Sequence, residues 1–86
     1  MTKQELKFNN GKYIGQVVNG LPEGKGIGYF INGDRYEGEW RNGKKEGKGI
    51  YYFNSGDRMM GDYYNDKLVG KHVRLTKNGD VKIENY

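Results

Sequence analysis

The side chains that most often carry catalysis are scarce or isolated in this sequence. His72 is the single histidine, cysteine is absent, and no serine or threonine stands beside a base in a recognisable arrangement. A histidine can act as a general base only if an acid faces it across the fold, and no such pairing is visible in the sequence. We therefore expect no catalytic residue and no enzyme activity, and we expect His72 to be structural or exposed.

Carboxylates recur at a fixed interval, because Asp34, Asp57 and Asp80 each follow the glycine of a turn. Such a series could bind calcium. However, each unit of two strands lengthens the sheet by about 9.5 Å, so successive aspartates lie about that far apart. One carboxylate per unit cannot supply the roughly six to eight oxygens that Ca²⁺ takes. Aspartate in Asn-Gly-Asp or Ser-Gly-Asp more often caps its own turn. We therefore expect turn-capping aspartates and no metal site.

Closely spaced glycines could form a phosphate-binding loop. The candidates are Gly24-Lys25-Gly26-Ile27-Gly28 and Gly47-Lys48-Gly49. No helical pattern follows either segment, and neither matches the dinucleotide fingerprint. We expect no nucleotide and no other cofactor, so these glycines need a different explanation.

The glycines recur because the whole chain repeats with a period of 23 residues. Residues 36–58 align with residues 13–35 and, more loosely, with residues 59–81. An internal period of this length indicates a repeat architecture. The coincident pairs include Tyr13 and Tyr36, Gly15 and Gly38, Gly20 and Gly43, Gly24 and Gly47, Gly26 and Gly49, Ile27 and Ile50, Phe30 and Phe53, and Asp34 and Asp57.

Each unit is predicted to contain two strands and two turns. Side chains alternate with a period of two over residues 36–41 and again over residues 47–53, as expected of strands. Asn42-Gly43 and residues 54–57 carry turn signals. We predict an all-β fold: an elongated single antiparallel β-meander of stacked hairpins, with about eight short strands. The expected strands are residues 3–8, 13–18, 25–31, 35–41, 48–53, 58–64, 71–76 and 81–84, with a loop at 19–23 that holds Pro22.

The two full units also share a specific motif. The second unit combines Tyr-x-Gly-x-Trp, a turn glycine, Gly-x-Gly and a later turn glycine, in Tyr36, Gly38, Trp40, Gly43, Gly47, Gly49 and Gly56. The first unit keeps all but the tryptophan, in Tyr13, Gly15, Gly20, Gly24, Gly26 and Gly33. This pattern resembles the MORN (membrane occupation and recognition nexus) repeat. The resemblance covers most of the chain and implies an elongated antiparallel sheet used as a binding or assembly platform, with no particular partner.

The repeat predicts a single domain, residues 1–86, that is built from successive units. A half unit (1–12) precedes two full units (13–35 and 36–58), and a degenerate unit (59–86) is expected to act as the cap that repeat arrays need. In that last unit Met59 replaces the tyrosine and His72 replaces the second glycine of Gly-x-Gly. The initial methionine and the divergent last unit favour a complete chain, and the alternative is a fragment of a longer array.

Composition narrows the function classes. The chain is 34% hydrophobic, has no cysteine, and carries 15 basic and 11 acidic residues for a net charge of +4. It contains no stretch near the ~20 apolar residues of a membrane span and no visible signal peptide. We expect a cytoplasmic protein whose mild positive charge reflects an ordinary mixed surface or suits an acidic partner.

Strand alternation assigns the large rings and the strand glycines to one face. A glycine weakens a strand unless a ring from a neighbouring strand packs over the bare backbone. We therefore expect Tyr36 and Trp40 to lie over glycines of neighbouring strands. The structural glycines of this face are Gly15, Gly24, Gly26, Gly38, Gly47, Gly49 and Gly61.

The aromatic face is the first candidate binding surface. A meander of 86 residues leaves nothing to form a second layer, open apolar patches mark interaction sites, and Tyr and Trp are enriched at hot spots. We hypothesise a concave aromatic face that holds a peptide or amphipathic helix of a partner protein, as an inhibitor or recruiter. Alternatively, the rings only cover each other and the glycines. The candidate contacts are Tyr13, Phe30, Tyr36, Trp40, Tyr51, Phe53 and Tyr63.

The opposite face is expected to carry an apolar column and a basic column. Peripheral binding to anionic, phosphoinositide-type lipids is the alternative function, although acidic residues on that face dilute its charge. Nucleic acid is disfavoured, because the pattern spreads the basic residues over both faces and the turns instead of gathering them beside the rings. The uncovered faces and the two sheet edges allow a homodimer. The candidate lipid contacts are Lys25, Lys48, Lys71, Arg35 and Arg58.

Overall fold

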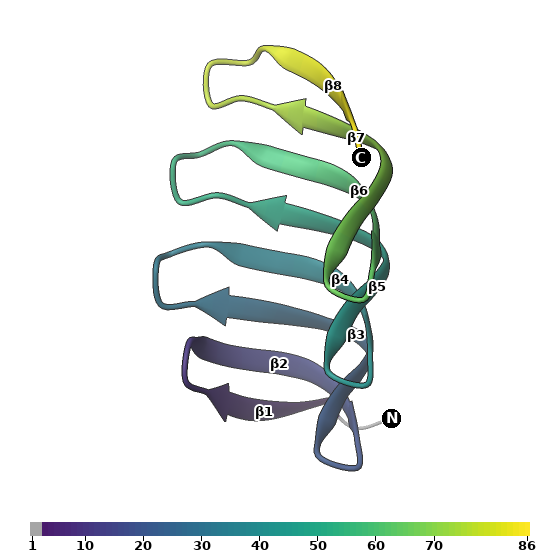
Figure 1. The fold of residues 1–86 in the computed structure, drawn as a ribbon. Helices are drawn as coiled ribbons and strands as arrows, with labels where there is room; N and C mark the ends of the chain where they lie inside the picture. Colours follow the sequence, from purple (N-terminus) through teal and green to yellow (C-terminus); the bar gives the residue numbers. More distant parts are fainter. Residues whose placement is uncertain (1–2) are drawn as a thin grey trace.

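The computed structural model describes residues 3–86, which form eight strands in a single antiparallel sheet (Figure 1). Each strand pairs with its neighbours in chain order, so the predicted all-β meander is confirmed. The described residues contain no helix, and therefore none with the length and hydropathy that a membrane span requires. The strands are β1 (Lys3–Phe8), β2 (Gly11–Val18), β3 (Leu21–Phe30), β4 (Arg35–Arg41), β5 (Lys44–Tyr52), β6 (Arg58–Tyr64), β7 (Lys67–Leu75) and β8 (Val81–Asn85).

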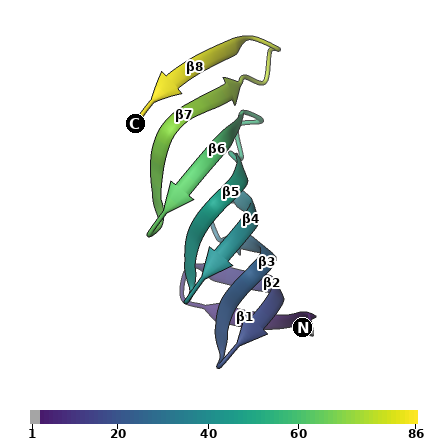
Figure 2. The same ribbon diagram turned by 90° about the vertical axis from the view of Figure 1, so that its right-hand side faces the viewer.

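The strands stack into an elongated body with extents of 39 × 24 × 20 Å. Figure 1 shows the hairpin turns on two opposite sides of the stack, and on the right the β2–β3, β4–β5 and β6–β7 hairpins curl over at their ends. We call these three ends the tips. Figure 2 views the stack from the side of the tips, where the strands follow one another in chain order.

The tips are tighter than expected, because each is a two-residue turn. Asn19, Asn42 and Asn65 have φ of 53°, 50° and 55°, and the residues that follow them also have positive φ. Positive φ at both central positions defines the type I′ turn, whose twist matches the strands. The expected loop at 19–23 is therefore wrong, and β3, β5 and β7 begin directly after their turns. Pro22 lies within β3, pairs with Val17 and is fully buried.

Three irregularities in the pairing bend the tips toward the aromatic face. They lie between Gly15 and Val17, between Gly38 and Trp40, and between Met60 and Asp62, each opposite extra residues on the next strand. Such bulges kink a strand and increase its local twist. The sheet is thus concave on its aromatic side because of three local bulges. We call this side the inner face and the opposite side the outer face.

Gly24 and Gly47 are bulge glycines, which corrects the expectation that rings cover them. Their φ values are +89° and +84°, a region that residues with a Cβ rarely adopt. A Cβ at either position would meet the side chain of Gln16 or Glu39, not a ring. Those side chains accept hydrogen bonds of 2.7 Å from the backbone N–H groups of the residues after the glycines. Gly24 and Gly47 therefore shape the bend.

The other strand glycines form a continuous row across the middle of the sheet. Register pairs each with the next from β2 to β6, in the order Gly15, Gly26, Gly38, Gly49 and Gly61. A Cβ on Gly26 would overlap the ring of Tyr13, and one on Gly49 the ring of Tyr36. The predicted packing of rings over bare backbone is confirmed for Gly26 and Gly49, and Trp40 similarly lies against Gly28. At Gly15 and Gly38 a Cβ would first meet the backbone of the next strand.

The core is a chain of rings on the inner face. Tyr13, Tyr36, Trp40 and Tyr63 are all buried and form its centre. Successive rings meet edge to face with centroids 5.0–5.4 Å apart, a favoured aromatic geometry. The order of the chain is Tyr13, Trp40, Tyr36, Tyr63, His72 and Tyr86.

Candidate interaction surfaces

The structure divides the seven aromatic candidates into two groups. Tyr13, Tyr36, Trp40 and Tyr63 have at most 9% of their surface exposed, so they hold the repeats together and cannot be reached without opening the core. Their polar atoms mostly face inward: the Tyr13 hydroxyl donates to the Gln16 carbonyl at 2.7 Å, and Trp40 Nε1 donates to the Gly26 carbonyl at 3.0 Å. The remaining candidates are Phe30, Tyr51 and Phe53, which are partly exposed.

The three accessible rings pack together on the inner face, next to the turns that join β3 to β4 and β5 to β6. The Phe30 and Tyr51 rings stack with centroids 6.1 Å apart, and the Tyr51 and Phe53 rings lie 4.9 Å apart. The Tyr51 hydroxyl donates to Asp34 Oδ2 at 2.9 Å. Burial, and then this carboxylate, raise the pKa of Tyr51. The rings are therefore held in fixed positions while part of each stays exposed.

Lys45 lies among these rings, and the sequence analysis did not single it out. Its Nζ is 5.4 Å from the ring centroid of Phe30, 5.6 Å from that of Tyr36 and 5.9 Å from that of Tyr51. Burial lowers its pKa, and the charge of Asp66 partly opposes this shift. A signal was available, because Lys45 occupies the tip position that Pro22 and Leu68 occupy in the neighbouring repeats.

A pocket of about 210 Å³ opens beside Lys45. Its walls are mainly apolar and come from the sheet and from the last tip, and Tyr86 also contributes. The hydroxyl of Tyr63 is buried and has no hydrogen-bond partner among residues 3–86. Burial raises the pKa of Tyr63 to about 12. The lining residues are Lys45, Tyr51, Phe53, Met59, Tyr63, Asp66, Leu68 and Tyr86.

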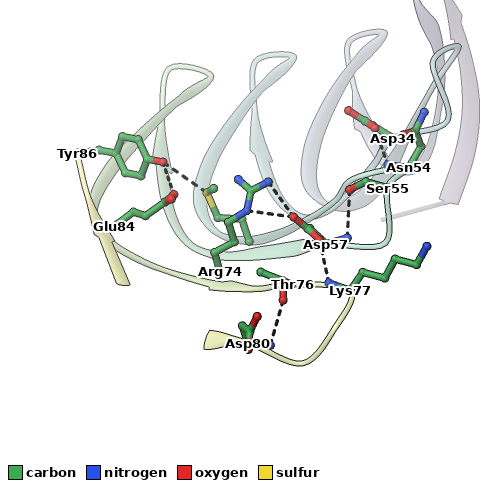
Figure 3. Close-up of polar contacts among 11 residues, drawn as sticks. Asp34, Asn54, Ser55, Asp57, Arg74, Thr76, Lys77, Asp80, Glu84 and Tyr86 are labelled. Atoms are coloured by element: carbon green, nitrogen blue, oxygen red, sulfur yellow. Dashed lines mark hydrogen bonds and ion pairs between the residues drawn. The ribbon is translucent and has the colours of Figure 1, made fainter. Parts of the chain in front are cut away.

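Two of the three periodic aspartates, Asp34 and Asp57, link one repeat to the next, which corrects the expectation that they only cap their own turns. Asp34 Oδ1 accepts the backbone N–H of Asn54 at 2.8 Å, and Asp57 Oδ1 accepts that of Lys77 at 2.8 Å (Figure 3). The Arg74 guanidinium also donates to Asp57 Oδ2 at 3.0 Å. The Lys77 N–H and then Arg74 lower the pKa of Asp57. In residues 3–86 no three metal-binding side chains converge.

His72 is part of the core. It is completely buried, and its Nε2 lies 2.8 Å from the backbone carbonyl of Asp62, so Nε2 donates a hydrogen bond there. Its ring contacts Tyr63 and Tyr86 edge to face. A Cβ on Gly61 would come within 2.5–2.7 Å of the His72 ring. Of the two sequence-based alternatives for His72, the structural one holds.

The lipid candidates separate into two rows on the outer face. Lys25 lies opposite Glu39 and Lys48 lies opposite Asp62, so this basic column is interleaved with carboxylates. Lys71 follows on β7, where it pairs with Asn85. Arg35 and Arg58 lie in a different row, on either side of Tyr52. The five residues therefore do not form one patch.

Comparison with known protein families agrees with this geometry. The model of the MORN repeat matches residues 13–35 and 36–58, more than half of the chain. None of the curated proteins compared with this chain matches it. MORN repeats form a non-catalytic repeat family that is generally associated with protein or membrane interactions. With the antiparallel hairpins, the rings over glycines and the repeated motif all in place, the chain belongs to the MORN-repeat family.

Proposed function

We propose that this protein is a non-enzymatic interaction module whose inner face binds a segment of a partner protein. The observation that carries the proposal is the cluster of Phe30, Tyr51 and Phe53, three partly exposed rings beside an apolar pocket. Aromatic residues, Phe and Tyr among them, are enriched at protein interfaces. The role is to hold a partner in place, as a recruiter or an inhibitor.

The dimensions of the pocket suit an anchoring side chain. Its volume of about 210 Å³ is below the roughly 300–1,000 Å³ of typical small-molecule sites. An apolar residue of the partner would fill it against Phe53 and Leu68, while Lys45 lies at the same surface as a cation. The rest of the segment would follow the concavity that the bulges create.

A peptide-display selection tests this proposal. Peptides of random sequence are selected on the immobilised full chain, and the enriched peptides are measured by calorimetry. Phe53→Ala should weaken their binding about 10-fold or more, because a hot-spot ring contributes about 2 kcal/mol. Tyr29→Ala is the matched control, since it removes an exposed ring from the outer face. Trp40→Ala is unsuitable, because that ring is in the core.

Two outcomes would refute the proposal. One is a selection that enriches no peptide, and the other is a set of peptides that bind Phe53→Ala and the unmodified chain equally well. Sedimentation with vesicles that contain phosphoinositide tests the lipid alternative in parallel. The carboxylates opposite Lys25 and Lys48 lead us to expect no stable sedimentation at physiological salt.

A further inference from the structure

Six residues of the outer face form one straight row, one residue on each strand from β1 to β6. The register joins each of them to the next. At about 4.8 Å per strand the row is about 24 Å long. In strand order it reads Lys7, Lys12, Tyr29, Arg35, Tyr52 and Arg58. We call it the cation–tyrosine row.

Positive charge is concentrated in this row. It contains four cations and no carboxylate, whereas the lysine column on the same face alternates with Glu39 and Asp62. The adjacent row contributes Glu5 and Glu37, and Glu37 forms an ion pair of 2.7 Å with Arg35. With these two carboxylates set against the four cations (4 − 2), the row and its neighbour keep a net charge of +2 to offer an anionic partner.

The two tyrosines alternate with the cations and are in contact with them. Lys12 Nζ lies 5.7 Å from the Tyr29 ring centroid, and the Arg35 guanidinium lies 4.0 Å from that of Tyr52. Arg58 approaches the Tyr52 ring to 5.9 Å. Tyr29 is 36% exposed, and Tyr52 is partly exposed. A guanidinium stacked on tyrosine covers one face of the ring and presents its own flat surface, on which a base can also stack.

We propose that the cation–tyrosine row binds single-stranded nucleic acid. Proteins that bind single strands without sequence preference combine a positive track for the phosphates with rings on which bases stack. The row provides both features in alternation. A membrane surface or an acidic peptide would need the cations but not the rings between them. The sequence-based argument against nucleic acid assumed that rings and basic residues were separate, and the register removes that assumption.

Fluorescence anisotropy with a labelled twelve-nucleotide oligothymidine tests the proposal. The length is within the roughly 4–16 nucleotides that one single-strand binding domain covers. Four phosphate contacts should give a slope of about −2.8 in a plot of log affinity against log salt, at about 0.7 per contact. Between 50 and 200 mM salt the affinity should thus fall about 50-fold.

Three variants test whether the cation–tyrosine row is the site that binds the oligonucleotide. Arg58→Gln should weaken binding about fivefold at 50 mM salt and reduce the slope by about 0.7. Tyr29→Ala should weaken binding about fivefold or more while leaving the slope unchanged, because it removes stacking only. Lys48→Gln is the matched control: it removes an exposed cation from the same face, and its effect should be less than twofold. Thermal melting of each variant verifies folding.

Four results would overturn the proposal. They are no binding at 50 mM salt, equal losses in Lys48→Gln and Arg58→Gln, full binding by the folded double variant with Tyr29→Ala and Tyr52→Ala, and equally tight binding of polyglutamate. Phosphoinositide vesicles that displace the oligonucleotide and bind independently of both tyrosines would assign the row to lipid instead. None of these results depends on the inner face, so Phe53→Ala should bind oligothymidine normally.

Discussion

The second repeat (36–58) and the last (59–86) achieve the same packing from opposite strands. In the second repeat, Tyr36 on β4 covers Gly49 on β5. In the last repeat the corresponding residues are Met59 and His72, and the ring of His72 on β7 covers Gly61 on β6. The comparison shows that each hairpin needs one ring over bare backbone, and that either strand can provide it.

A second exchange preserves the link between repeats. Tyr51 donates its hydroxyl to Asp34 at 2.9 Å, and Arg74, at the equivalent position one repeat later, donates its guanidinium to Asp57 at 3.0 Å. Both aspartates also accept a backbone N–H from the following turn. The acceptor is kept while the donor changes from a neutral to a charged group. At these two positions the last repeat therefore differs from the second in its residues but keeps the packing of a ring over glycine and the link to the preceding repeat.

The largest expected effect follows from filling the space under a ring. Gly49→Val should lower the free energy of unfolding by about 3 kcal/mol or more, because its side chain would occupy the position of the Tyr36 ring. Gly79→Ala is the control, since apart from its chain neighbours no atom of residues 3–86 lies within 4 Å of its Cβ position, and its φ of +93° is what opposes the change. That strain should cost about 1 kcal/mol. Urea denaturation measures both, and equal losses would contradict ring packing at Gly49.

Removing the ring of His72 should destabilise the protein slightly less than Gly49→Val does. His72→Gly leaves a cavity among Gly61, Tyr63 and Tyr86 and should lower the free energy of unfolding by about 2–3 kcal/mol. Adding Met59→Tyr should recover at least 1 kcal/mol, because it restores the arrangement of the second repeat. A double-mutant cycle measures this coupling. If the effects of His72→Gly and Met59→Tyr simply add, the ring of one strand cannot replace that of the other, and the comparison of the two repeats fails.

A pH titration examines the link between repeats. The pKa of Asp57 is below its ordinary value of 3.8, so its folded form holds the proton less tightly than the unfolded chain. Its contribution to stability is therefore complete above about pH 4 and is lost as the pH falls through the folded pKa. Asp57→Asn should reduce the loss of melting temperature between pH 5 and pH 2. Asp80→Asn is the control, because among the described residues no hydrogen bond joins its carboxylate to another repeat. An identical pH profile for Asp57→Asn and the unmodified chain would contradict the link.

The sequence was sufficient for the architecture because a period of 23 and an alternation of two determine strand order and faces together. It was insufficient where one residue type serves two purposes. Gly24 and Gly49 look alike in the sequence, but one provides a left-handed bulge and the other leaves room for a ring. His72 gave no indication of the direction in which its ring would lie. Lys45 was missed because alternation does not show which tip residues fold back over the core.

The smallest expected effect concerns a hydroxyl that the two repeats use differently. Trp40 Nε1 donates to the Gly26 carbonyl, but Tyr63, its equivalent one repeat later, has a buried hydroxyl with no partner in the described part of the chain. Tyr63→Phe should therefore leave stability unchanged or raise it by up to about 1 kcal/mol, because an unsatisfied polar group is removed.

The same substitution should change the alkaline limit of stability. The folded protein retains the Tyr63 proton up to about pH 12, whereas an unfolded tyrosine ionises near its ordinary pKa of 10.0. The contribution of Tyr63 is thus complete below pH 10 and decreases between pH 10 and 12. The stability of the Tyr63→Phe variant should therefore fall less steeply with pH in this range than that of the unmodified chain, as followed by circular dichroism. A large loss of stability at pH 7 would instead mean that the hydroxyl has a partner, and the two repeats would then be more alike than the structure indicates.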